Sequence, residues 1–139
     1  MDFKRFGNKI VMRIDKGEEV VETIKKFCED HKITLGSISG LGAAERIKVG
    51  LFDVLEKKYY SKEFVGDYEI SNLTGNISTM NGETYLHIHI TITDDEMRGF
   101  GGHLNEALIS GTCELVIDII DGMVDREFND DIGLNLFKF

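Results

Sequence analysis

The sequence predicts an α/β domain of the α+β kind, in which one long helix covers a mostly antiparallel sheet. Three observations support this prediction. A single amphipathic segment near the N-terminus has helical periodicity. Several β-type runs follow it, separated by short stretches in which glycine is frequent. Such short connections join antiparallel strands more easily than they join parallel strands, which need helical crossovers. The length of 139 residues, with apolar residues spread evenly along it, predicts that residues 1–139 form a single domain.

The long covering helix is expected at about residues 18–30, after a first strand over residues 9–13. Its apolar residues recur at helical spacing and would face the sheet. Residues 15–18 read Asp-x-x-Glu, a pattern typical of a helix N-terminus. Acidic residues open the helix, whereas Lys25 and Lys26 come later, which complements the helix dipole.

The β-type runs begin after residue 33. They are residues 37–39, 47–54, 59–65, 69–77, 85–93 and 114–120. The pair Asn81-Gly82 lies between two of these runs and is a strong hairpin signal. We therefore expect neighbouring runs in the chain to pair as antiparallel strands.

The composition is that of an ordered globular protein, with 42% apolar residues in 139 and no proline. No apolar run is long enough to span a membrane, and the first residues lack the apolar segment of a signal peptide. Cys28 and Cys113 have no Cys-x-x-Cys spacing and lie among apolar residues, which favours buried free thiols. These features predict a cytoplasmic protein with no membrane partner.

The charge balance disfavours binding to nucleic acid through the chain's own surface. Sixteen basic residues stand against twenty-five acidic ones, giving a net charge of −9. Binding to DNA depends largely on neutralising phosphates with Lys and Arg. The segment 39–45 contains Gly-x-Gly but neither of the glycine-rich nucleotide-binding patterns, so nucleotide binding by these motifs is also disfavoured.

The histidines carry the strongest chemical signal. Residues 85–93 alternate with a period of two, which places His87 and His89 on one face of a strand with Cα atoms about 6.5–7 Å apart. A third histidine, His103, follows Gly101 and Gly102, which allow the backbone to approach closely. We predict that His87, His89 and His103 bind one metal ion.

Three neutral imidazoles that leave a fourth position open are typical of zinc sites, although iron, nickel and copper accept the same ligands. The alternative is a polar sheet face or a hydrogen-bonded histidine pair. Glu69, Glu106 and Glu114 are candidates for a general acid or base beside the metal, but the sequence does not position them. Whether the chain is an enzyme stays open at this point.

Several short segments together resemble one known family, the Plants and Prokaryotes Conserved (PPC) domain in its stand-alone prokaryotic form. The segments are Gly36-Ser-Ile-Ser-Gly-Leu-Gly42, Tyr68-Glu-Ile70, Leu73-Thr-Gly-Asn-Ile77, Leu86-His-Ile-His89, Gly101-Gly-His-Leu104, and Arg126-Glu-Phe128 through Gly133-Leu134. The resemblance implies a mostly antiparallel sheet, assembly as a homotrimer, and metal ligation by the three histidines.

In plant relatives this domain follows an AT-hook, and prokaryotic relatives are often called DNA-binding by association. This sequence contains no Arg-Gly-Arg-Pro segment of the AT-hook type. The leading hypothesis is therefore a homotrimeric zinc-binding protein that acts on or senses a small ligand. The alternative is a DNA-binding or regulatory oligomerisation module.

Overall fold

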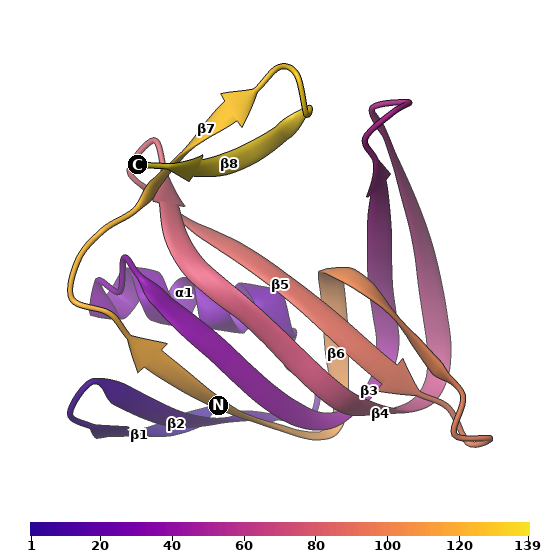
Figure 1. Cartoon of the computed structure of the whole chain (residues 1–139). Helices are drawn as coiled ribbons and strands as arrows, with labels where there is room; N and C mark the ends of the chain where they lie inside the picture. The colour runs from indigo at the N-terminus through magenta and orange to yellow at the C-terminus, as the bar shows by residue number, and fades with distance from the viewer.

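The computed structural model describes all residues 1–139 and contains eight strands and one helix (Figure 1). In chain order the elements are β1 (Asp2–Phe6), β2 (Lys9–Asp15), α1 (Val20–His31), β3 (Gly36–Asp53), β4 (Lys58–Met80), β5 (Glu83–Thr93), β6 (Gly99–Ile119), β7 (Asp125–Asn129) and β8 (Leu134–Lys138). All strand pairs are antiparallel, which confirms the mostly antiparallel sheet.

Six strands form one sheet in the order β1-β2-β6-β3-β4-β5, and β5 also pairs with the first residues of β6. Strands β3, β4, β5 and β6 therefore form a closed ring of pairings at one end of the sheet. Strands β7 and β8 form a separate hairpin, which projects at one side in Figure 1, while the hairpin between β3 and β4 projects at the other.

Several runs that the sequence separates belong to single long strands. Residues 37–39 and 47–54 lie on or at the end of β3, and residues 59–65 and 69–77 both lie on β4. The strands bend at register shifts, for example between Gly40 and Gly42, instead of turning back. The glycine-rich segment before residue 114 is likewise part of β6, and strands β1, β7 and β8 were not predicted.

The helix lies close to the expected residues 18–30, but with 12 residues it is short, and the expectation of a long covering helix is not supported. It begins after Glu19, whose carboxylate accepts hydrogen bonds from the N–H groups of Val21 and Glu22 at 3.0 and 2.7 Å. It ends at Lys32, which adopts the left-handed conformation with φ 55°. The Asp-x-x-Glu pattern instead stabilises the turn before the helix, where the Asp15 N–H donates to Glu18 Oε2 at 2.8 Å.

The Asn81-Gly82 hairpin is confirmed between β4 and β5. Both residues have positive φ, at 53° and 82°, which is the requirement of the tight turn that this pair favours. The turn fixes the register of β5 against β4, in which Asn76 lies opposite His87 and Thr74 opposite His89.

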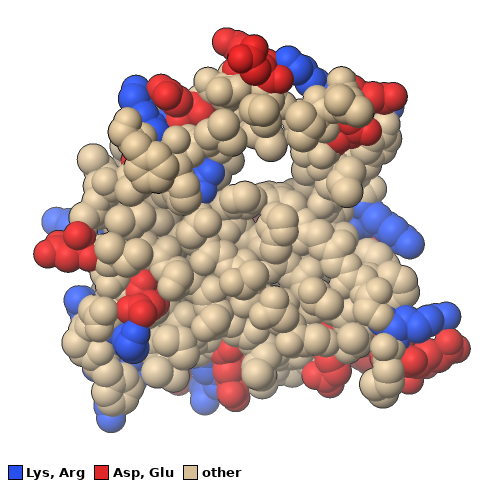
Figure 2. Space-filling view, viewed as in Figure 1, with Lys and Arg blue, Asp and Glu red and all other residues tan.

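The core lies between α1 and the sheet and contains 25 buried apolar residues. Helix α1 crosses behind the sheet in Figure 1, so the opposite face is turned to the viewer. Figure 2 shows that this opposite face is mostly free of charged side chains, which gather around its rim. The structure contains no helix with the length and apolarity needed to cross a membrane.

Candidate metal centre

Strand β5 has two chemically different faces, as its alternation predicts. Ile88, Ile90 and Ile92 are buried in the core. His87 and His89 alternate with them and therefore project from the opposite face. Burial of the isoleucines fixes the register of this strand, because a slip of one residue would send every isoleucine to the open face. The core thus determines where the two histidines point.

Strand β6 supplies the third histidine. His103 lies directly opposite His89 where β5 and β6 pair, and opposite Gly50 where β6 passes to β3. Residues directly opposite each other in an antiparallel pair project from the same face. His103 therefore projects from the same face as His89. His87, two residues before His89 on β5, projects from that face too.

Glycines allow β6 to approach β5 and β3 this closely. A Cβ atom at Gly101 would lie 2.4 Å from the carbonyl oxygen of Ile90, and one at Gly102 would lie 2.7 Å from the carbonyl oxygen of Gly50. Both distances are too short for any side chain without movement of the backbone. By contrast, a Cβ at Gly99 would meet no atom within 4 Å.

The three imidazoles converge on one point. One ring nitrogen from each of His87, His89 and His103 lies within 4.8 Å of the other two, and the ring centroids are 5.1, 5.2 and 5.7 Å apart. Nitrogens that bind one tetrahedral zinc ion at about 2.0–2.1 Å lie about 3.3 Å apart. The observed separations exceed this value by at most about 1.5 Å.

The environment of His87 and His103 favours the neutral form of both imidazoles. Burial lowers the pKa of His87 to about 4, and positive charge on His103, His89 and Arg126 lowers it further in the same direction. Burial also lowers the pKa of His103, with a smaller effect from His89. Neutral imidazoles have a free lone pair, so this arrangement favours metal ligation over protonation at neutral pH.

The histidines line a pocket of about 750 Å³. Phe64 and Phe100 form one wall with ring centroids 5.1 Å apart, and Tyr59 packs against His103 with centroids 6.4 Å apart. The Tyr59 hydroxyl donates to Asn105 Oδ1 at 2.9 Å. Apolar and aromatic walls around a few polar groups are typical of pockets for small molecules.

Two hairpins border the pocket and touch each other. Lys57, between β3 and β4, donates from Nζ to the carbonyl oxygen of Asp130, between β7 and β8. Phe52 on β3 also packs beside Gly133. In Figure 2 these two projections approach each other over a hollow in the uncharged face.

The acidic residues considered from sequence lie elsewhere. Glu69, Glu106 and Glu114 each line other depressions of the surface, and none lines the histidine pocket. The fourth histidine, His31, packs at the helix end against the rings of Phe3 and Phe27. The structure therefore places three of the four histidines together and provides no carboxylate from these candidates.

Arg126 on β7 was named from the sequence only within a segment that resembles the family, with no role of its own, and it is 6% exposed. Its guanidinium donates to Ser78 Oγ, the Asn135 carbonyl oxygen and Asn76 Oδ1 at 2.8–2.9 Å. It also lies between the rings of Tyr85 and Phe137, at 4.7 and 4.2 Å from their centroids. A single arginine in a short polar segment carries no sequence signal of burial, because its burial depends on where the β7–β8 hairpin packs.

The two cysteines do not join the site. Cys28 and Cys113 are both buried, free thiols in the core, as predicted. Burial raises the pKa of each thiol to about 12, so neither is a thiolate at neutral pH. Histidine nitrogen is therefore the ligand type that this chain offers at the site.

Comparison with protein families and solved structures identifies relatives along the whole chain. The model of the Plants and Prokaryotes Conserved (PCC) domain matches residues 1–121. A search of curated proteins finds no match.

Three solved structures show how closely the fold is shared. A protein from Bacteroides thetaiotaomicron, provisionally named DNA-binding, is 38% identical over 99% of this chain and 96% of its own, with a TM-score of 0.97. A metal-containing protein from Archaeoglobus fulgidus is 30% identical over 100% and 99%, with a TM-score of 0.90. A plant- and prokaryote-conserved (PPC) protein from Pyrococcus horikoshii is 29% identical over 99% and 94%, with a TM-score of 0.87.

Proposed function

The chain belongs to the Plants and Prokaryotes Conserved domain family, and from that membership and the histidine cluster we propose that it is a metal-binding protein acting on or sensing a small ligand. His87, His89 and His103 are the proposed ligands of one divalent transition metal, and zinc is the ion that we propose. The observation that carries the proposal is the convergence of three ring nitrogens within 4.8 Å.

The donor set fits zinc on chemical grounds. Neutral imidazole nitrogen is a preferred ligand of zinc, and three protein ligands leave a fourth position for water or substrate. A bound zinc ion would polarise a carbonyl group or lower the pKa of a water molecule at that position. A metal-containing relative of known structure, the Archaeoglobus fulgidus protein, supports the same proposal.

The chain's own residues have definable roles in this proposal. The buried isoleucines of β5 fix the direction of His87 and His89, and Gly101 and Gly102 let His103 come into range. Phe64 and Phe100 exclude water from one side of the pocket. No acidic side chain lines the pocket, so a general acid or base would have to be Tyr59, a histidine or the metal-bound water itself.

The test is the metal content of protein purified without a nickel column. We expect about one zinc per chain, and loss of most of it in each of His87→Ala, His89→Ala and His103→Ala. The matched control is His31→Ala, because His31 lies at the helix end and touches none of the three. Full zinc occupancy in any one of the three site variants would contradict the proposed ligand set.

We also propose that the chain assembles as a homotrimer, with residues 1–139 acting as one unit. Large apolar side chains are exposed on the projecting hairpins, including Leu51 at 64%, Val65 at 72% and Phe128 at 57%. Exposed apolar surface of this kind is commonly covered in symmetric assemblies. Light scattering should give about three times the chain mass of 15.7 kDa, and a monomer at micromolar concentration would contradict the trimer.

The second candidate is a DNA-binding or regulatory module, which the provisional name of the Bacteroides thetaiotaomicron relative favours. The net charge of −9 argues against DNA binding by this chain alone. Fluorescence anisotropy with duplex DNA at physiological salt discriminates the two functions. Salt-sensitive submicromolar binding would support the module, and its absence is the result that we expect.

A further inference from the structure

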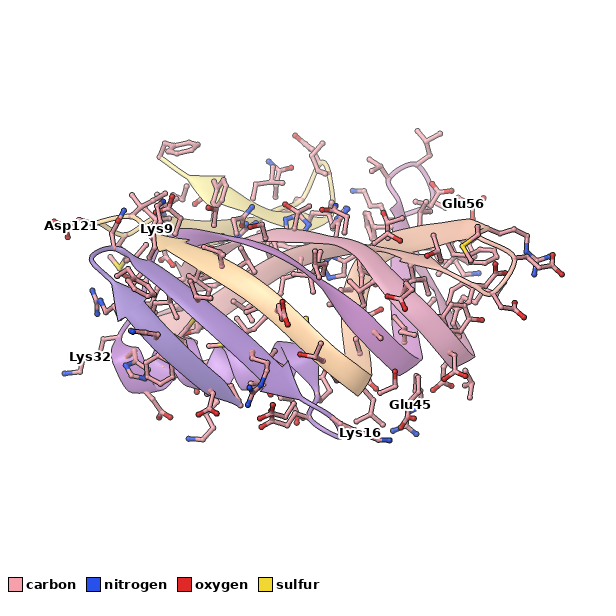
Figure 3. The ribbon with its side chains drawn as sticks, turned by 90° about the horizontal axis from the view of Figure 1, so that it is seen from below. Lys9, Lys16, Lys32, Glu45, Glu56 and Asp121 are labelled. Atoms are coloured by element: carbon pink, nitrogen blue, oxygen red, sulfur yellow. The ribbon has the colours of Figure 1, made fainter.

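The pocket above the histidines differs in charge from the rest of the molecule. The chain has 25 acidic residues, yet none of the 17 residues that line this pocket is Asp or Glu. Its one formally charged lining residue is Lys62. In Figure 3, labelled charged residues such as Lys16, Glu45 and Asp121 lie at the periphery instead.

Lys62 brings an unneutralised positive charge to the pocket. It forms no ion pair with a carboxylate, and its Nζ lies over aromatic rings, 4.8 Å from the centroid of Phe64 and 5.9 Å from that of Phe100. A contact with an aromatic face uses none of the three N–H donors of the ammonium as a conventional hydrogen bond, so these donors can still bind an anion. The ammonium therefore stands beside the apolar wall on which a ligand would rest.

Arg126 adds a second positive charge behind the pocket. All three groups that accept its hydrogen bonds are neutral, and no carboxylate pairs with it. It stacks on Tyr85, which lines the pocket, and it holds Asn76, which lies opposite His87 on the neighbouring strand. A buried charge without a counter-ion is costly, and an anion in the adjacent pocket would offset part of that cost.

The proposed metal would be a third positively charged group, with a charge of +2. Three neutral imidazoles leave the full charge of a divalent ion uncompensated, in contrast to sites that include a carboxylate ligand. The pocket therefore combines a metal position and Lys62, with Arg126 behind its wall, and no acidic residue lines it. Its walls, by contrast, are apolar and aromatic, with nine hydrophobic residues among the 17.

From this combination we infer that the pocket selects a small organic carboxylate with an apolar body. The carboxylate lies between the metal position and Lys62, and the apolar body rests against Phe64 and Phe100. The metal's part of this inference rests on the proposed function, whereas the contributions of Lys62 and Arg126 come from the chain itself.

Phenylacetate, its neutral analogue phenylacetamide, and acetate are suitable probes. Isothermal titration calorimetry would measure their affinities for the full chain in zinc-loaded and zinc-free forms. We expect phenylacetate to bind the zinc-loaded protein about tenfold more tightly than phenylacetamide, because only the carboxylate gains from the positive charges. Acetate should bind more weakly than phenylacetate, because it lacks the apolar body.

The variant Lys62→Met keeps an apolar stem and removes the charge. It should weaken phenylacetate binding by about threefold and leave phenylacetamide binding unchanged. The factor is modest because the ammonium is exposed to solvent, which screens its charge. The matched control is Lys4→Met, since Lys4 also lies over an aromatic ring, Phe6 at 5.4 Å, but on β1 outside the pocket. Lys4→Met should change neither affinity.

The outcomes separate this inference from the proposed metal site. If zinc binds but phenylacetate and phenylacetamide bind equally, the carboxylate inference is overturned and the metal site stands. If zinc does not bind, the zinc-free titrations decide: a phenylacetate preference that falls in Lys62→Met supports the inference, and equal affinities overturn it. Equal affinities for acetate and phenylacetate would overturn the inference that the ligand has an apolar body resting against Phe64 and Phe100.

Discussion

The two faces of β5 differ in what determines their residues. The isoleucine face is closed by the helix and the rest of the core, so its residues are selected for packing. The histidine face lines a pocket, where packing in the core does not explain the presence of imidazole side chains. The closed face thus provides stability and the open face provides chemistry, on one strand with one register. Substitutions on the two faces should therefore separate effects on stability from effects on metal binding.

The largest effect should come from the closed face. Ile90→Ala removes a buried side chain and should lower the free energy of unfolding by about 2–4 kcal/mol. His89→Ala, on the same strand but exposed, should lower it by less than about 1 kcal/mol in zinc-free protein. Chemical denaturation of both zinc-free variants measures this difference. Equal destabilisation would show that the two faces do not divide stability and function in this way.

The strand that supplies His103 tests whether close packing positions the site. Gly101→Ala places a Cβ within 2.4 Å of the Ile90 carbonyl oxygen and should lower the free energy of unfolding by about 1–3 kcal/mol. It should also reduce zinc affinity, since β6 must move away from β5. Gly99→Ala is the control on the same strand, because its Cβ meets nothing within 4 Å. If both variants bind zinc equally well, the close approach is not what positions His103.

The smallest predicted effect concerns pH and the open face. In zinc-free protein the pKa of His87 is lowered to about 4 and that of His103 is also lowered, while histidine in the unfolded chain titrates near about 6.5. The unfolded chain therefore binds more protons as the pH falls from about 6.5 towards 4, and the free energy of unfolding should decrease over this window. Since solvent screens these partly exposed rings, the decrease should be on the order of 1 kcal/mol.

Urea denaturation at several pH values measures that decrease, and His87→Asn provides the comparison. The variant should show a shallower dependence between about pH 6.5 and pH 4, because one of the two rings with a lowered pKa is gone. An identical dependence in both proteins would mean that His87 is not held neutral by the fold.

The sequence predicted those parts of the site that depend on local periodicity. The alternation of residues 85–93 placed His87 and His89 correctly, since a buried strand face leaves only one register. The Asn81-Gly82 turn was equally readable, because few residue pairs accept positive φ twice. The helix starts two residues later than expected, at Val20, since the capping carboxylate is that of Glu19 and not that of Asp15.

Features that depend on distant parts of the chain were not predictable in the same way. The sequence predicted that Gly101 and Gly102 allow a close approach of the backbone, but not that they lie on a strand that packs against two neighbouring strands. Lys62 lines the pocket because the β3–β4 hairpin folds towards it, and Arg126 lies behind the pocket wall because the β7–β8 hairpin packs there. No local pattern encodes the absence of acidic residues from the pocket, since that absence arises from the tertiary arrangement.

X-ray absorption spectroscopy at the zinc edge tests the metal site most directly. For the zinc-loaded protein we predict four nitrogen or oxygen neighbours at about 2.0–2.1 Å, three of them with the outer-shell scattering of imidazole. In His103→Ala, measured at a zinc concentration high enough to load the weakened site, one imidazole contribution should be lost. A sulfur neighbour at about 2.3 Å, or fewer than three imidazoles in the unaltered protein, would contradict the assignment of His87, His89 and His103 as the ligands.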